Sequence, residues 1–496
     1  MFMLLRILLI CFSVLVQSDD AYNNILCDTN KAVDPTDLSL PYYWPWTWNE
    51  NQTGPSIGPN QACRWTVAIP PTHFVSFIMM ADIGGNSSLK ITDCNGRTEI
   101  VMTSQEQPYV FVGMEFVIDL VVGNSPDSAH LGFRIQWNAF SKAAPAYYNV
   151  SKSSDSLVFD EMLAENAVVV TAETRVSLIA FPAAYPDFTP LLRITLVFDG
   201  PTIDSPYLGN LYQAVRSNKP FVSSGNQMTI FTFQENYVVG SFFIVQDYYN
   251  QESLTDIKGV TCWSESSCPV TLTADYGPVE AITLNVDDGD EYIKNLDLSS
   301  DALLKIYIGA RREGDDSNVI ATYDTSDSKS NIPQKFNAEM LTFYLEKGTA
   351  LVELAEDQNY TRWNDAIPGR EGFITSRRYG YSAYYQDIFE AIGGFNKTER
   401  FQFHVNVTHI DVSNNATLII TCTCEEHTVV HTLSSSSDLK EDQVFVAQGN
   451  NITVEYTTYG SETTGFFLDF RIEQLMESGS MRESFIFLIL LVVLLF

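Results

Sequence analysis

CRWTVAIPP, residues 63–71, alternates apolar and polar side chains and then stops at two prolines. Successive side chains of a strand point to opposite faces, so Trp65, Val67 and Ile69 share one face. Proline lacks the N–H that a β-ladder needs, so the proline pair ends the strand. We predict that Trp65 fills the core of a β-sandwich and that this stretch specifies a scaffold.

Strand-like patterns continue along the whole chain. Aromatic and β-branched residues are abundant, apolar runs are short and helical periodicity is nearly absent, which predicts an all-β protein. A leucine two residues before an isoleucine recurs in a strand pattern, and these leucines stand 103, 112 and 114 residues apart. The four copies are SLKIT at Ser88, LLRIT at Leu191, LLKIY at Leu303 and TLIIT at Thr417.

Two further markers recur in the same order. One is FVSSGNQMTI from Phe221 and FVAQGNNITV from Phe445, with looser copies FVGMEFVIDL from Phe111 and FNAEMLTFYL from Phe336. The other is a glycine that opens a late strand, at Gly132, Gly240, Gly348 and Gly465. Three markers in one order, four times over, predict tandem modules, and the period fits one small β-sandwich domain.

The predicted modules cover residues 19–145, 153–252, 256–360 and 385–475. Two runs are interpreted as joints between them: AFSKAAPAYYNVSKSSD, residues 139–155, and the Arg-, Gly- and Tyr-rich residues 368–395.

Both ends of the chain carry targeting patterns. Residues 1–18 have one arginine, an apolar run and small residues near the end, which predicts a cleaved signal peptide. The small triplet Ser478–Ser480, a short polar spacer and a short apolar tail predict a glycolipid (GPI) anchor on Ser478, with residues 479–496 removed. A short tail anchor is the alternative, although twelve apolar residues are few for a membrane span.

The net charge of −32 makes nucleic acid an unsuitable partner, because phosphates repel an acidic chain. In an exported chain the N-x-S/T sequons predict N-linked glycans on exposed loops or strand edges. The eight sequons begin at Asn51, Asn86, Asn149, Asn359, Asn396, Asn406, Asn415 and Asn451.

Seven cysteines remain after removal of the signal peptide, and export predicts disulfides among them. Cys262 and Cys268 bracket a short Ser-rich turn, which a local disulfide would close. The odd count leaves at least one thiol free or paired between chains.

A cysteine two residues before a tryptophan, an alternating strand, a proline turn, the apolar strand HFVSFIMM and then SLKITDCNG together resemble the CUB domain. The resemblance covers residues 27–137 and is closest to the CUB-like domain of secreted nematode proteins. It implies a jelly-roll β-sandwich and a Cys27–Cys63 disulfide, and it leaves Cys94 unassigned. Many CUB domains bind calcium through loop carboxylates, but this sequence does not show the family's pattern of calcium ligands. The carboxylates that come nearest to such ligands are those of Asp82 and Asp93.

No motif for catalysis stands out. The chain has no G-x-S-x-G, H-E-x-x-H, Walker or dinucleotide-binding motif, so we predict no enzyme and no catalytic residue. TCTCEEHTVVH places Cys422, Cys424, His427 and His431 close together, but in an unbroken strand the cysteines and histidines face opposite sides. We therefore assign no metal and no cofactor, while calcium stays open.

Two aromatic runs are the candidate binding surfaces. They are YYWPWTW, residues 42–48, where Trp46 and Trp48 are the candidate ligand contacts, and RRYGYSAYY, residues 377–385. Alternatively, the first run simply covers an end of the sandwich.

We predict tandem CUB-like jelly-roll β-sandwiches in a non-enzymatic glycoprotein that is GPI-anchored at the outer face of the plasma membrane or secreted. It would bind a glycan or an extracellular protein. The family resemblance implies innate defence against pathogens. One alternative is a self-associating adhesion or structural protein, and another is a hydrolase that uses the modules for targeting.

Overall fold

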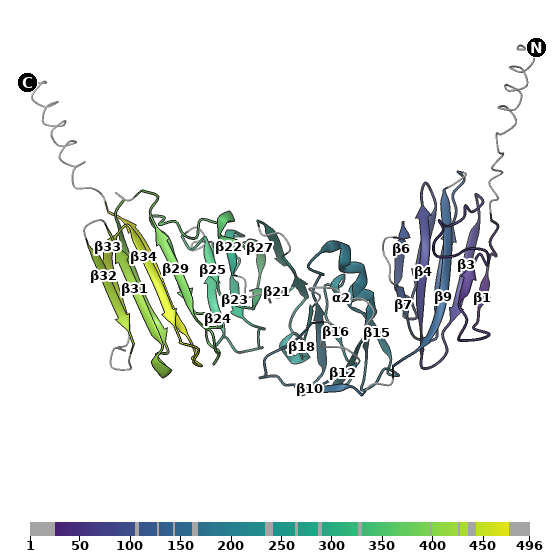
Figure 1. The fold of residues 1–496 in the computed structure, drawn as a ribbon, viewed down its shortest axis with the longest axis horizontal. Coiled ribbons are helices and arrows are strands. Elements are labelled where there is room, and N and C mark those ends of the chain that lie inside the picture. Colours follow the sequence, from purple (N-terminus) through teal and green to yellow (C-terminus); the bar gives the residue numbers. More distant parts are fainter. Residues whose placement is uncertain are drawn as a thin grey trace, which may run out of the picture.

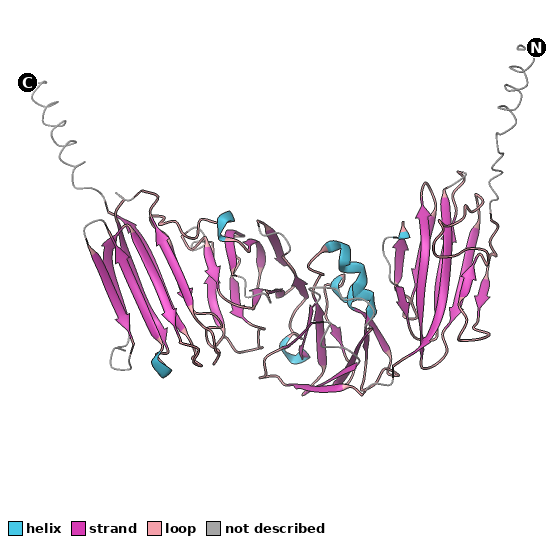
Figure 2. Cartoon of the chain, in the orientation of Figure 1, coloured by secondary structure: helices cyan, strands magenta, loops and turns pink. Residues whose placement is uncertain are grey.

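The structure, a computed structural model, is built almost entirely of strands, which hold 53% of the residues against 6% in helices. It describes residues 25–104, 109–125, 128–141, 144–160, 167–233, 242–262, 266–285, 290–325, 330–396, 399–424, 427–434 and 443–475. The predicted signal peptide, Ser478 and residues 479–496 lie outside these ranges. Figure 1 shows four sandwiches in sequence order along the molecule, and Figure 2 shows that most helical residues belong to the second.

The first module packs two antiparallel-rich sheets face to face. Their strand orders are β1-β3-β8-β5-β6 and β2-β9-β4-β7, and β1 pairs with β3 in parallel. The strands are β1 (Lys31–Val33), β2 (Tyr42–Trp44), β3 (Ala62–Ala68), β4 (His73–Ile83), β5 (Ser88–Thr92), β6 (Thr98–Val101), β7 (Tyr109–Phe111), β8 (Glu115–Val121) and β9 (Ala129–Ala139).

The second module repeats this topology strand for strand. Its sheets have the orders β10-β12-β17-β14-β15 and β11-β18-β13-β16, again with a parallel first pair. The elements are β10 (Ala146–Val150), β11 (Leu157–Asp160), β12 (Ala167–Ala172), β13 (Val176–Ala180), η2 (Pro186–Ile194), β14 (Thr195–Phe198), β15 (Tyr207–Asn210), α2 (Leu211–Val215), β16 (Phe221–Val222), β17 (Gln227–Thr232), β18 (Phe242–Asp247) and η3 (Tyr248–Asn250).

The third module has the same two sheet orders, β19-β21-β26-β23-β24 and β20-β27-β22-β25. Its elements are β19 (Asp256–Val260), β20 (Cys268–Ala274), β21 (Val279–Leu284), β22 (Glu291–Leu298), β23 (Leu304–Ile308), β24 (Val319–Tyr323), β25 (Gln334–Phe336), β26 (Met340–Leu345), β27 (Gly348–Ala355) and η4 (Gln358–Tyr360).

The fourth module keeps the order but shortens the start. Its sheets are β28-β35-β30-β33 and β29-β34-β31-β32, and in place of a first strand a single parallel bridge joins Asp365 to Gly393. The elements are β28 (Glu371–Thr375), β29 (Ile388–Gly393), β30 (Phe401–Ile410), η5 (Ser413–Asn415), β31 (Thr417–Thr423), β32 (Thr428–Leu433), β33 (Gln443–Gly449), β34 (Asn451–Thr457) and β35 (Phe466–Gln474).

The predicted all-β fold of tandem sandwiches is confirmed, with two local corrections. LLRIT was predicted as a strand, but Leu192 lies in the 3-10 helix η2 and the strand starts only at Thr195. Both runs interpreted as joints contain strands, namely β10 in the first and β28 and β29 in the second. Their polar and aromatic composition resembles loops because these edge and joint strands bury few aliphatic side chains.

The modules also pack against one another. Val110 and Val112 of the first contact Ile194, Leu196 and Phe231 of the second in one apolar cluster, with Phe74, Phe140, Phe198 and Phe233 around it. At the next joint, Ile179, Phe181 and Ile244 of the second module meet Ile257 and Ile282 of the third. Each joint is therefore a small buried core and not an open linker.

A buried carboxyl makes the third module sensitive to pH. Glu291 is 4% exposed, accepts a hydrogen bond from the Thr283 hydroxyl at 2.7 Å, and burial raises its pKa to about 7. The folded chain thus holds this proton more tightly than the unfolded chain, so stability falls as the pH rises from about 4.5 through 7.

We expect Glu291→Gln to raise the free energy of unfolding by about 1–3 kcal/mol at pH 8, because glutamine cannot ionise, and to change it little near pH 4. Urea unfolding of residues 19–477 at both pH values measures this. An equal effect of the substitution at pH 4 and pH 8 would refute the pH dependence.

Candidate functional site

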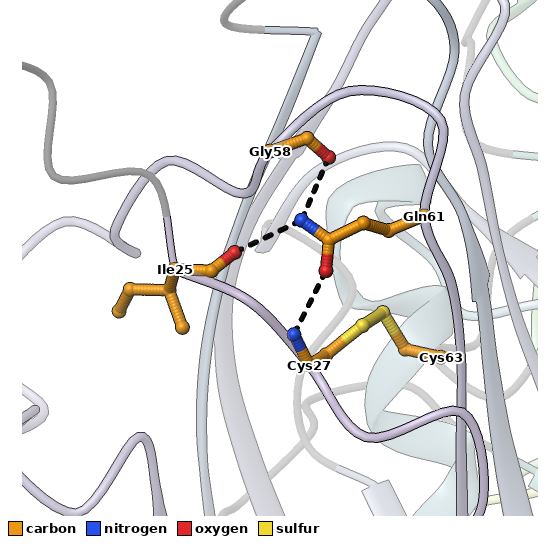
Figure 3. The surroundings of a disulfide bond; sticks show 5 residues. All are labelled: Ile25, Cys27, Gly58, Gln61 and Cys63. Carbon is orange, nitrogen blue, oxygen red and sulfur yellow. Dashed lines mark hydrogen bonds between the residues drawn. A yellow bond between two sulfur atoms is a disulfide. The ribbon is translucent and has the colours of Figure 1, made fainter.

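Both disulfides predicted for this chain are present. Cys27 bonds Cys63, which ties the segment before β1 to β3, and Cys262 bonds Cys268 across the predicted turn. Gln61 reinforces the first link (Figure 3). Its amide accepts a hydrogen bond from the Cys27 N–H at 2.8 Å and donates to the Ile25 and Gly58 carbonyls. These cysteines are structural, since disulfides constrain the chain.

The other cysteines of the described residues are thiols: Cys94, Cys422 and Cys424. Burial raises the pKa of the Cys94 and Cys422 thiols to about 11, so both are protonated and slow to exchange near neutral pH. Cys422 faces the fourth core, whereas Cys424 follows the end of β31 with its Sγ 3.0 Å from Nδ1 of His427. Within the described residues, no three His, Cys, Asp or Glu side chains gather as a metal site.

Asp93, named above as a candidate calcium carboxylate, already has hydrogen-bond donors on both oxygens. Oδ1 accepts the N–H groups of Asn95 and Arg97 at 2.9 Å, and Oδ2 accepts Nε2 of Gln213, from the second module, at 2.8 Å. Asp82 is exposed on β4. Asp93 therefore links the first two modules through its hydrogen bond from Gln213.

Trp46 and Trp48 lie in opposite environments. Trp46 is 87% exposed, whereas Trp48 is 5% exposed and donates from Nε1 to the Gln52 carbonyl. A Cβ atom on Gly132 would lie only 2.6 Å from the Trp48 ring, so any larger residue at this position would clash with the indole. This explains why residue 132, one of the repeat markers, is glycine. Trp48 thus packs on the outer face of β9, and of this pair only Trp46 is exposed to a ligand.

The glycosylation sequons lie at the surface. Asn406 and Asn451 are half-buried on strands, and the others are exposed: Asn51, Asn86, Asn149, Asn359, Asn396 and Asn415.

The second aromatic run, residues 377–385, has two tyrosines that pack into the protein and two that are exposed. Tyr379 and Tyr381 pack against the core of the third module. Fully buried Gln386 holds the end of the run by donating to the Tyr381 carbonyl and accepting from the Ser376 hydroxyl. Tyr384 and Tyr385 are 53% and 77% exposed.

These two displayed tyrosines line a groove between the third and fourth modules. One part, a cavity of about 160 Å³, is lined by Asn285, Asp290, Asn337, Ala338, Glu339, Arg377, Arg378, Tyr384 and Tyr385. The other, of about 380 Å³, is lined by Asp290, Lys335, Asn337, Arg377, Asp387, Ile388, Phe389, Glu390, Glu455, Tyr456 and Thr457. Asp290, Asn337 and Arg377 belong to both parts, and we call the whole the joint groove.

Charges of the joint groove are paired within the protein. Lys335 lies between Asp290, at 2.6 Å, and Glu390, which also accepts the Trp363 Nε1–H at 2.8 Å. Arg378 pairs with Glu339. Burial, followed by the charge of Asp290, raises the pKa of Tyr292, so this phenol beside the groove stays protonated. Such a surface offers many hydrogen-bond acceptors, because its acidic side chains outnumber its basic ones.

Asn337 is the distinctive polar group of the groove. Its Nδ2 donates to the Thr375 carbonyl at 2.8 Å, but its buried Oδ1 has no hydrogen-bond partner in the protein. A buried acceptor without a donor costs about 1–3 kcal/mol, so a ligand donor would satisfy it. The backbone of Tyr385 has φ +61°, a costly conformation for a bulky residue that is often found at functional sites.

Sequence reasoning pointed to the tyrosine run but missed most of this groove. Its other residues come from separate segments near 285–290, 335–339, 387–390 and 455–457, and none carries a motif.

Comparisons with known proteins agree with the fold. Residues 23–141 match the CUB-like domain family. Residues 149–233 and 249–357 each match a domain of unknown function, DUF7592 and DUF7591 respectively. A CUB-like domain is therefore present, as the resemblance implied; the nematode family is not shown. No curated protein sequence matches the chain.

Two solved structures show what the chain is similar to. The CUB1-EGF-CUB2 domain of human MASP-1/3 matches at 9% identity and TM-score 0.15, over 38% of this chain and 94% of that one. The full extracellular region of zebrafish Gpr126/Adgrg6 matches at 10% identity and TM-score 0.18, over 92% of this chain and 54% of that one.

CUB-like domains are extracellular and typically non-catalytic, and none of the matched family descriptions names an enzyme. The CUB-like domain therefore favours an extracellular protein. In the part of the chain that the structure describes, helices are too short or too polar to span a membrane.

Proposed function

We propose that this protein is a cell-surface or secreted glycoprotein that binds a glycan, and that the joint groove is its binding site. The observation that carries the proposal is the unpartnered Oδ1 of buried Asn337 in a groove walled by Tyr384 and Tyr385. Ligand sites typically combine rigid aromatic walls with a few convergent polar groups.

A neutral glycan fits these walls better than an anionic ligand does. Sugar hydroxyls would donate to Asn337 Oδ1 and to groove carboxylates such as Glu455, while the exposed tyrosine rings pack against the apolar faces of the sugar. Lys335 and Arg378 are already held in internal ion pairs, and the lining has more carboxylates than basic groups, so an anionic ligand is disfavoured.

The biological setting of the proposal comes from the sequence. A GPI anchor on Ser478 would hold many copies in one membrane patch and so raise avidity, and phospholipase release from cells tests for that anchor. A role in innate defence against pathogens is proposed from the family resemblance alone.

We expect the secreted ectodomain, residues 19–477, to bind specific spots on a glycan and bacterial-surface array. Tyr385→Ala removes a rigid exposed ring from the groove wall and should weaken binding to those spots about 10-fold or more. Titration of the best glycan by calorimetry measures the loss.

Two matched substitutions serve as controls. Tyr276 is 94% exposed and outside the joint groove, so Tyr276→Ala should leave the affinity unchanged. Trp46→Ala tests the other aromatic surface, and a loss there with none in Tyr385→Ala would move the site to the first module. Uniform absence of array binding would refute glycan recognition and favour self-association between copies.

A further inference from the structure

A second cavity lies between the third and fourth modules, in a part of the joint separate from the joint groove. It measures about 440 Å³ and is lined on one side by Ala321, Thr322 and Tyr323 of edge strand β24. The other side is the outer face of the sheet β28-β35-β30-β33. In Figure 1, β24 and β25 lie on the side of the third module that faces the fourth. We call this space the inter-module cleft.

Asn406 stands on the floor of the inter-module cleft, in the sequon Asn406-Val407-Thr408. In register it lies between Asp469 of β35 and Val444 of β33. Its Oδ1 is buried and has no hydrogen-bond partner in the protein. As with any buried acceptor, this is costly unless a group from outside the polypeptide donates to it.

On the β33 side of Asn406 the surface is apolar and open, whereas Asp469 of β35 lies on the other side. Val444 is 67% exposed and Val446 is 50% exposed, and both belong to β33, an edge strand. An edge strand with exposed apolar side chains can pair with a strand of another chain, so proteins usually cover the edges of their sheets. A sugar chain attached to Asn406 would begin directly beside these valines.

We propose that the first sugars of an N-linked glycan on Asn406 occupy the inter-module cleft, cover Val444 and brace the joint by contact with β24. Attachment forms a bond from Nδ2 to C1 of the first sugar, breaks the bond from C1 to a lipid-linked diphosphate, and releases the Nδ2 proton. The sugar's own N–H and hydroxyl groups then supply donors for Oδ1. The inference rests on the proposed export, because the donor is met only in the secretory pathway.

Asn406→Gln tests this inference, with Asn415→Gln as the matched control, because Asn415 is an exposed sequon in the same module. The ectodomain is made in a eukaryotic host, and site occupancy is measured by mass spectrometry. We expect the Asn406 glycan to resist endoglycosidase at least about 10-fold longer than the Asn415 glycan in the native protein. After denaturation both glycans should be removed equally.

Loss of the glycan should also loosen the joint. We expect Asn406→Gln to lower the Tm by about 2–4 °C and to speed hydrogen exchange in β24 and β33, whereas Asn415→Gln changes neither. Thr408→Ala removes the same glycan while keeping Asn406, and should reproduce both effects.

The outcomes separate the inference from the proposal it rests on. If the other sequons are occupied but Asn406 is not, the inference is wrong and export stands. If no sequon is occupied, export itself fails and the inference fails with it. Equal endoglycosidase rates at Asn406 and Asn415, with unchanged exchange in β24, would also overturn it.

Discussion

Replacing Trp65 by alanine is expected to destabilise the first module by about 3–5 kcal/mol. The indole is fully buried between the sheets, with its ring centroid 4.7 Å from that of Trp44 and 5.3 Å from that of Phe133. The side chains around Trp65 belong to strands that are held by their own hydrogen bonds in both sheets. They therefore cannot close the cavity that the substitution leaves. Hydrogen exchange of β3 and β8 in residues 19–477 should accelerate at least about 100-fold.

Trp46→Ala is the matched control for this prediction. Its ring is 87% exposed in the same module, so its loss should change the free energy of unfolding by no more than about 0.5 kcal/mol. Similar exchange rates in the Trp65→Ala and Trp46→Ala proteins would mean that Trp65 does not hold the two sheets together.

Alternation around Trp65 could be read from the sequence because it is local. The same holds for most of the repeat markers, although Gly132 lies inside β9 (Ala129–Ala139) and does not open that strand. The Phe-Val-x-x-Gly pattern of residues 221–230 and 445–454 and its looser copies fall at the turn from the seventh to the eighth strand, as in β16–β17 and β33–β34. In the third and fourth modules the marker glycine that opens the last strand has positive φ, +81° at Gly348 and +80° at Gly465, which explains why glycine recurs there.

The failures of the sequence predictions have equally physical causes. Leu192 is buried in η2 just as a strand leucine would be, so a short apolar run could not distinguish the helical turn from a strand. Trp46 and Trp48 belong to one aromatic run, yet only Trp48 is buried, because Gly132 on a distant strand leaves room for its ring. Long-range packing of this kind leaves no local signal.

The joint groove is the strongest case of this limit. Tyr384 and Tyr385 come from a run that attracts notice, but Asn337 is an isolated asparagine whose unpartnered oxygen becomes evident only when two modules meet. A site built at a joint combines residues from several distant segments, so it depends on how the modules pack and not on any motif.

Packing at the joints can be tested directly at Arg193, which belongs to the LLRIT repeat copy but was not predicted to have a role at a joint. Its guanidinium is 1% exposed, donates from Nη2 to Glu99 of the first module at 2.6 Å, and lies over the rings of Tyr109 and Tyr212. We expect Glu99→Gln to weaken the joint between the first two modules by about 3–5 kcal/mol, because it removes the charged carboxylate that faces the buried guanidinium. Hydrogen exchange of η2 and α2, with small-angle scattering of the ectodomain, measures the loss.

Asp119→Asn provides the control, since the Arg64–Asp119 pair is exposed in the same module and should contribute at most about 1 kcal/mol. The cost of Glu99→Gln can be traced to the charge of Arg193 by the double variant Glu99→Leu with Arg193→Met. If the buried guanidinium causes the cost, this double variant should recover most of the lost stability, because an apolar pair of similar size can replace a buried ion pair. If Glu99→Gln costs no more than Asp119→Asn, then the apolar cluster around Phe231 holds the joint and the ion pair only orients it.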